Sequence, residues 1–104
     1  MENCAVVIRD DLLAMEVLDR AAECLRTIAH PVRLRIIQIL LQGERPVGEL
    51  AEACGIASHM MSEHLRILKD RGLLHKERQG RKIYYRIAEP CLGDIMKCVA
   101  KGHF

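Results

Sequence analysis

The sequence predicts a mainly α-helical domain with one small β-hairpin, in the order ααααββα. Two stretches carry this prediction. Residues 47–72 hold two amphipathic segments that meet at Gly55, and residues 73–87 alternate apolar and polar side chains around Gln79-Gly80, as two paired strands do. A helix, a short glycine turn, a second helix and a hairpin in this order are typical of the winged helix-turn-helix fold.

Glycines mark the ends of both helices of the helix-turn-helix. The first helix is expected over residues 47–54, because Gly55 can take the left-handed conformation that a Cβ disfavours. The second is expected over residues 58–71, with Gly72 ending it. Apolar residues recur there at intervals of three and four, which predicts a buried face formed by Met61, Leu65 and Leu68.

Two helices are expected before this unit. Asp10 can cap a first helix that runs to about Ala29 and carries apolar residues at helical spacing. The second, over residues 32–42, is apolar on nearly every side and should be the central buried element.

The hairpin and one more helix are expected after it. Strands are predicted at residues 73–78 and 81–87, and a last helix at residues 91–101. Residues 1–9 show no clear period and are interpreted as an N-terminal arm, which leaves residues 10–104 as a single winged-helix DNA-binding domain.

Composition narrows the class of protein. Only 3% of the 104 residues are aromatic, which argues against binding of single strands by base stacking. No apolar run approaches the roughly 20 residues of a membrane span, and the N-terminus does not resemble a signal peptide, so we expect a cytoplasmic protein whose five cysteines are reduced. The common catalytic motifs are absent and no cysteine has an evident general base, so an enzyme is disfavoured.

Polar and basic residues lie where a winged helix meets double-stranded DNA. The N-terminal half of the second helix of the helix-turn-helix faces base edges in this fold, and the hairpin tip and helix flank meet phosphate. Serine and histidine can donate to or accept from bases, and lysine and arginine attract phosphate. The predicted DNA-binding residues are Ser58, His59, Ser62, Glu63, Arg66, Lys69, Arg78, Gln79, Arg81 and Lys82.

Three stretches resemble the ArsR/SmtB family of winged-helix repressors. They read LRTIAHPVRLRIIQILL, VGELAEACGIASHMMSEHLRILKDRGLL and KERQGRKIYYRI. The resemblance implies a homodimer joined through the first and last helices, which binds a palindromic operator, represses transcription and is released by an inducer. Metal ions are the family's usual inducers, and thiol oxidants or persulfides act on some members.

The family's known sensor motifs are not intact. Pro46 and Gly48 stand where one metal motif has cysteines, and Glu89-x-Cys91 replaces the Asp-x-His of the zinc-type site, whose later histidine falls at about Gly102. The two persulfide-sensor positions hold Gln38 and Phe104. The resemblance therefore carries the fold and DNA binding, but no sensor.

The cysteines offer a different sensor. Cys91 and Cys98 lie about 10.5 Å apart along one helix at ~1.5 Å per residue, beyond the ~7 Å between Cα atoms that a disulfide spans. Each would need a partner among Cys24, Cys4, His103 or a second subunit. Thiolates with a histidine favour Zn, Cd, Cu(I) or As(III), whereas a dithiol would be a redox switch.

Other interpretations stay open from the sequence. All the cysteines could simply pack, which would make the protein a DNA binder that needs no ligand. A winged helix can also serve as a protein-interaction module without DNA. DNA binding that falls steeply with salt would separate the first two interpretations from the third.

Overall fold

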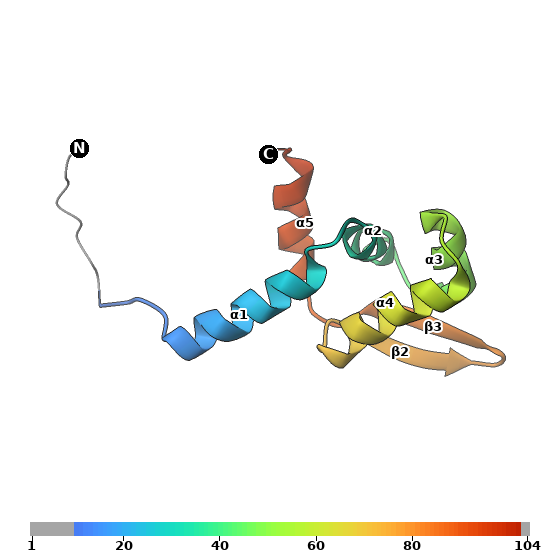
Figure 1. The fold of residues 1–104 in the computed structure, drawn as a ribbon, viewed down its shortest axis with the longest axis horizontal. Helices are drawn as coiled ribbons and strands as arrows, with labels where there is room; N and C mark the ends of the chain where they lie inside the picture. The colour runs from blue at the N-terminus through green and yellow to red at the C-terminus, as the bar shows by residue number, and fades with distance from the viewer. Residues whose placement is uncertain (1–9, 103–104) are drawn as a thin grey trace.

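The computed structural model describes residues 10–102, and five helices and three strands form there in the predicted order with one addition. The helices are α1 (Met15–Ile28), α2 (Pro31–Leu40), α3 (Val47–Cys54), α4 (Ser58–Asp70) and α5 (Leu92–Ala100). The strands are β1 (Arg45–Pro46), β2 (Leu74–Gln79) and β3 (Lys82–Ile87). Figure 1 shows α3, α4 and the β2–β3 hairpin gathered at one end and α1 extending away at the other.

Strand β1 is the element that the sequence did not predict. The sheet is antiparallel in the order β1-β3-β2, with Arg45 opposite Tyr85 and Leu74 opposite Ile87. The hairpin turns through Gly80 and Arg81, and only Gly80 has a positive φ, 65°, as the first position of a type II′ turn requires. Strand β1 therefore joins the hairpin to the start of the helix-turn-helix.

The core lies where α2, α3, α4 and the sheet meet. The predicted face of α4 is confirmed, because Met61, Leu65 and Leu68 are all fully buried. Leu50 of α3 and Leu92 of α5 are also fully buried. These side chains hold the helix-turn-helix, the hairpin and the last helix as one packed unit.

Helix α2 is central but not buried all round, contrary to the prediction. Ile36, Ile37 and Leu40 are buried against α3, α4 and the sheet. Leu34 is half-buried and Leu41 is 41% exposed, because their side of the helix opens onto a groove between α2 and α5.

Helix α1 begins later than predicted. Ala14 is its N-cap residue, and Asp10 lies before the helix instead of capping it. Much of the apolar side of α1 remains open, including Leu18 and Leu25, which are 42% and 52% exposed. The first turns contact too little of their own chain to extend the helix to Asp10.

No helix within residues 10–102 is long and apolar enough to cross a membrane.

Gly55 is expected to be required by the turn between α3 and α4. Its φ is 67°, so Gly55→Ala should lower the free energy of unfolding by about 1 kcal/mol, because an alanine in the left-handed region is strained. Urea denaturation of the two proteins measures the difference.

Gly48→Ala is the matched control. Gly48 lies inside α3, and a Cβ there would meet nothing within 4 Å. This change should leave stability unaltered or raise it by up to about 1 kcal/mol. Equal destabilisation by both changes would contradict the role given to Gly55.

Candidate nucleic-acid interface

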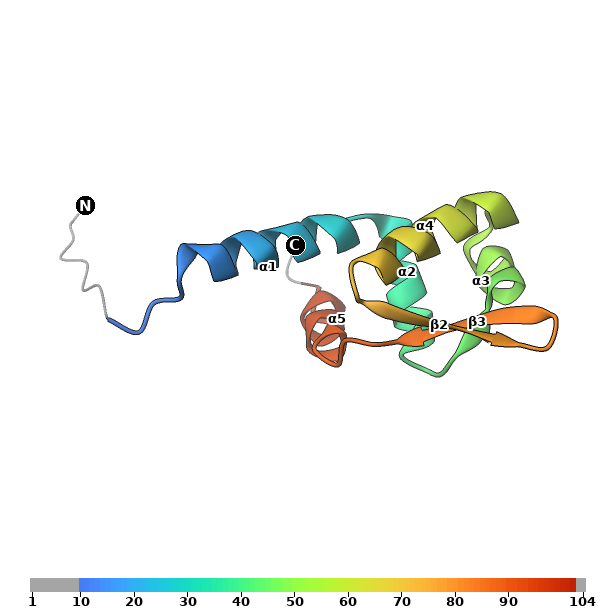
Figure 2. The same cartoon turned by 90° about the horizontal axis from the view of Figure 1, so that it is seen from below.

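The first half of α4 turns a polar face to solvent. Because Met61 and Leu65 point into the core, Ser58, His59 and Ser62 are left exposed on the outer side of the helix. Figures 1 and 2 show this helix beside the β2–β3 hairpin, at the end of the molecule opposite the start of α1. The polar face and the hairpin tip therefore belong to one end of the protein.

The hairpin tip, residues 78–82, carries positive charge, and we call it the wing. Arg78, Arg81 and Lys82 are exposed, and within residues 10–102 none of them forms an ion pair. Gln79 differs, because its Nε2 donates to Oε1 of Glu44 at 2.9 Å. Gln79 thus ties the wing to the loop before β1, and the three cations are available to an anion.

The cations on the second half of α4 are already paired. Arg66 Nη2 lies 2.7 Å from Oε1 of Glu63, and Nη1 lies 3.4 Å from Oδ2 of Asp70. Glu63, and then Asp70, raise the pKa of the Arg66 guanidinium. Lys69 is 3.2 Å from the same Asp70. Exposed pairs of this kind are weak, so phosphate can exchange with the carboxylates, but the wing cations need no such exchange.

Two shallow hollows connect α4 with the wing. Ser62 lines both of them. The first also holds Glu49, Arg81 and Lys82, and the second holds Arg66, Lys69 and Lys76. Ser62 of α4 is therefore a neighbour of Arg81 and Lys82 in space, although these residues are far apart in the sequence.

Two residues of this surface were missed from the sequence. Lys76 of β2 lines the hollow with Arg66, and strand alternation alone did not show which face of the hairpin it would occupy. Met60 is 48% exposed beside His59, on the outer face of α4. It was missed because methionine next to an apolar stripe resembles core, yet an exposed methyl group there can contact the methyl group of thymine.

The structure describes three of the five candidate sensor residues. Cys24 of α1 is half-buried, and Cys91, just before α5, is exposed. Among the causes that raise the pKa of Cys91, the charge of a Cys24 thiolate is a minor one. Cys98 is exposed further along α5, while Cys4 and His103 lie outside the described residues.

Cys91 is a poor thiolate in this surrounding. Its pKa is raised first by the hydrogen bond with Glu89 and then by partial burial and by the charges of Glu89, Cys24 and Asp94. A raised pKa keeps a thiol protonated and slows its reaction with oxidants or metals. Within residues 10–102, no three His, Cys, Asp or Glu side chains are grouped so that they could hold a metal ion.

Residues 28–77 match the model of a helix-turn-helix domain family. The chain is 42% identical over 81 residues to the HTH-type transcriptional repressor SmtB of Mycobacterium tuberculosis, an alignment that covers 78% of this chain and 60% of that protein. It is 35% identical over 85 residues to the probable mercury resistance operon repressor of Streptomyces lividans, covering 79% of this chain and 68% of that protein. The chain thus spans less than two thirds of the length of the mycobacterial repressor.

A solved structure agrees with these sequence matches. It is a homodimeric winged helix-turn-helix DNA-binding domain from Mycobacterium bovis, described as a possible ArsR-family transcriptional regulator. It superposes with a TM-score of 0.75 at 35% identity, and the match covers 86% of this chain and 85% of that one. The chain belongs to the ArsR/SmtB family. Members of this family regulate transcription and are not enzymes, in agreement with the prediction from the sequence.

Removal of Glu89 should activate the Cys91 thiol. The carboxylate raises the pKa of Cys91, so Glu89→Gln should lower that pKa and speed alkylation of Cys91 by iodoacetamide near neutral pH. Mass spectrometry of peptides from timed reactions measures the rate at each cysteine. Cys98 supplies the internal control, and an unchanged rate ratio between Cys91 and Cys98 would contradict the assigned effect of Glu89.

Proposed function

We propose that this ArsR/SmtB-family protein is a homodimeric transcriptional repressor that binds a palindromic operator in double-stranded DNA and is released by an inducer. The observation that carries the proposal is the exposed polar half of α4 beside three wing cations that form no ion pair within residues 10–102. This arrangement suits a helix in the major groove and basic side chains on phosphate. The repressor names of the two relatives support the same function.

Within this proposal, helix and wing have different tasks. Ser58, His59 and Ser62 contact base edges and set sequence preference. Arg78, Arg81 and Lys82 bind phosphate, which supplies affinity without sequence information and releases counterions. Glu63 and Asp70 pair with Arg66 in the free protein, and phosphate replaces them when DNA binds.

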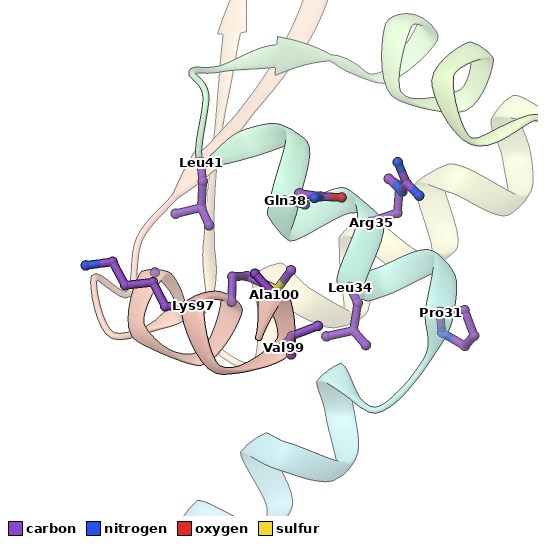
Figure 3. A pocket seen from close by; sticks show the side chains of 10 residues that line it. Pro31, Leu34, Arg35, Gln38, Leu41, Lys97, Val99 and Ala100 are labelled. Carbon is purple, nitrogen blue, oxygen red and sulfur yellow. The ribbon is translucent and has the colours of Figure 1, made fainter. Parts of the chain in front are cut away.

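A second copy of the chain covers the apolar surface left open by the first. The apolar side of α1 includes Leu18 and Leu25, and the groove beside α5 exposes Leu34, Leu41 and Val99, as Figure 3 shows. Arg35 and Lys97 rim this groove, and neither forms an ion pair within residues 10–102. Helix α1 carries acidic residues such as Glu16 and Asp19, which complement these cations. The homodimeric relative from Mycobacterium bovis supports this assembly.

Release by an inducer would act on the same two helices. A dimer presents two copies of α4, which must be roughly 34 Å apart to enter successive major grooves. A thiophilic ion or an oxidant at Cys24 and Cys91 would change how α1 and α5 pack, and so the spacing. The electrostatic effect of Cys24 on Cys91 supports this site, and the raised pKa of Cys91 makes a slow response the expected one.

Loss of the wing cations should weaken DNA binding without changing sequence preference. The double change Arg81→Ala with Lys82→Ala leaves up to two phosphates without a cation, so the slope of log affinity against log salt should flatten by roughly 0.9 for each such phosphate. Fluorescence anisotropy on duplexes that the protein selects from a random pool measures affinity and slope.

Lys101→Ala is the control for charge. Lys101 is the exposed C-cap residue of α5, and Figure 2 shows α5 far from the tip of the hairpin, so removal of this charge should leave the slope unaltered. If the wing variant kept the full slope, or if no duplex were enriched by the unmodified protein, the proposed function would be wrong.

A charge on the apolar side of α1 should separate the dimer. Leu18→Glu places a carboxylate within that surface and should yield monomers, because an unpaired buried charge is costly. Arg20→Glu introduces the same group two residues along, where the side chain points another way, and should leave dimers intact. Light scattering after gel filtration measures the mass, and circular dichroism checks that each variant is folded. A monomeric unmodified protein would refute the dimer.

A further inference from the structure

A side-chain cluster outside the DNA-facing surface links α4 to the junction of α1 and α2. Arg33 of α2 donates from Nε to Nδ1 of His64 on α4, at 3.1 Å. Its Nη1 also donates to the backbone oxygen of Thr27, near the end of α1, at 2.9 Å. The ring of His30 lies against that of His64, with centroids 4.8 Å apart. One guanidinium therefore connects three helices.

Both histidine rings must be neutral in this arrangement. Nδ1 of His64 accepts from Arg33, and Nδ1 of His30 accepts from the backbone N–H of Val32 as the N-cap of α2. A nitrogen that accepts a hydrogen bond carries no proton, so each ring holds its proton on Nε2. The cluster thus depends on a protonation state that histidine can lose in mildly acidic solution.

Protonation of His64 would break the link to Arg33. Two N–H donors would then face each other, and a second positive charge would stand beside the guanidinium. The surroundings of His64 resist this step. Burial, and then the charges of His30 and Arg33, lower the pKa of His64 below its ordinary value of 6.5, whereas the charge of Glu63 raises it. Helix α4 also packs on α1, α3 and β2, but within residues 10–102 no carboxylate of those elements compensates the charge on His64.

We propose that His64 is a positioning residue, whose protonation uncouples α4 from the α1–α2 junction and thereby weakens DNA binding in mildly acidic solution. The inference rests on the proposed function, because it treats α4 as the DNA-contacting helix and α1 as a dimer helix. The coupled arrangement binds one proton fewer than the uncoupled one. The stabilisation that this coupling contributes is therefore complete above pH 6.5, and it is lost as the pH falls through the lowered pKa of His64.

The expected direction is unusual for a DNA-binding protein. A cation at the interface is attracted to phosphate, so protonation of a base-contacting side chain would tighten DNA binding as the pH falls. Protonation of His64 should instead weaken DNA binding, because it uncouples α4, the helix that carries the base contacts, from the α1–α2 junction.

The link itself can be tested without DNA. In an NMR titration of the unmodified chain, the His64 ring should change its charge below pH 6.5, and the Arg33 Nε–H signal should shift in the same step. The free energy of unfolding should fall over the same range, and less so in His64→Gln, whose amide oxygen can accept from Arg33 without titrating. An Arg33 signal that ignores the titration would overturn the proposal.

The effect on DNA is measured by anisotropy with a duplex that the protein has selected from a random pool. Between about pH 7.5 and about pH 5.5, the unmodified protein should lose about fivefold or more in affinity. The ratio between the affinities at the two pH values should collapse in His64→Gln and persist in His75→Gln, a change at an exposed histidine of β2 outside the predicted DNA-binding set. Equal ratios in the unmodified protein and His64→Gln would refute the role of His64. Absence of binding at about pH 8 would instead refute the proposed function, and the NMR result would still decide whether the link exists.

Discussion

The burial of one face of α4 is the constraint on which the rest of the structure depends. Met61, Leu65 and Leu68 are fully buried against α2, α3 and the sheet. Because a helix has a fixed angular spacing, burial of this face determines which side chains point outward. Ser58, His59 and Ser62 are exposed for that reason, and the same rotation directs His64 towards Arg33. The core thereby sets both the outer surface of α4 and its connection to the α1–α2 junction.

The periodic elements could be predicted from the sequence, and contacts between elements could not. Residues 58–71 predicted α4 to within one residue, because an apolar face and a terminal glycine mark it clearly. Strand β1 is only two residues long, too short for any period, and it exists because Arg45 and Pro46 meet Tyr85 and Tyr84. The late start of α1 reflects missing tertiary contacts, which a capping residue such as Asp10 does not reveal.

The candidate site shows the same division. Residue type and fold predicted a set of DNA-facing side chains, which stays a prediction. They did not show that Arg66 is paired with Glu63, while the wing cations form no ion pair in the described part of the chain. Those pairs depend on rotamers and on which carboxylates lie within reach. The sequence named Cys24 as a partner for Cys91, but the effect of one thiol on the pKa of the other depends on the fold.

The edges of the small sheet have a consequence for assembly. Strand β1 forms one edge and ends at Pro46, which has no backbone N–H to offer a further strand. Strand β2 forms the other edge, and its exposed Lys76, Glu77 and Arg78 keep another backbone away by charge and solvation. Both edge strands of the sheet thus resist strand addition. A wing that must remain extended and accessible is therefore protected from joining the wing of another molecule into a continuous aggregated sheet.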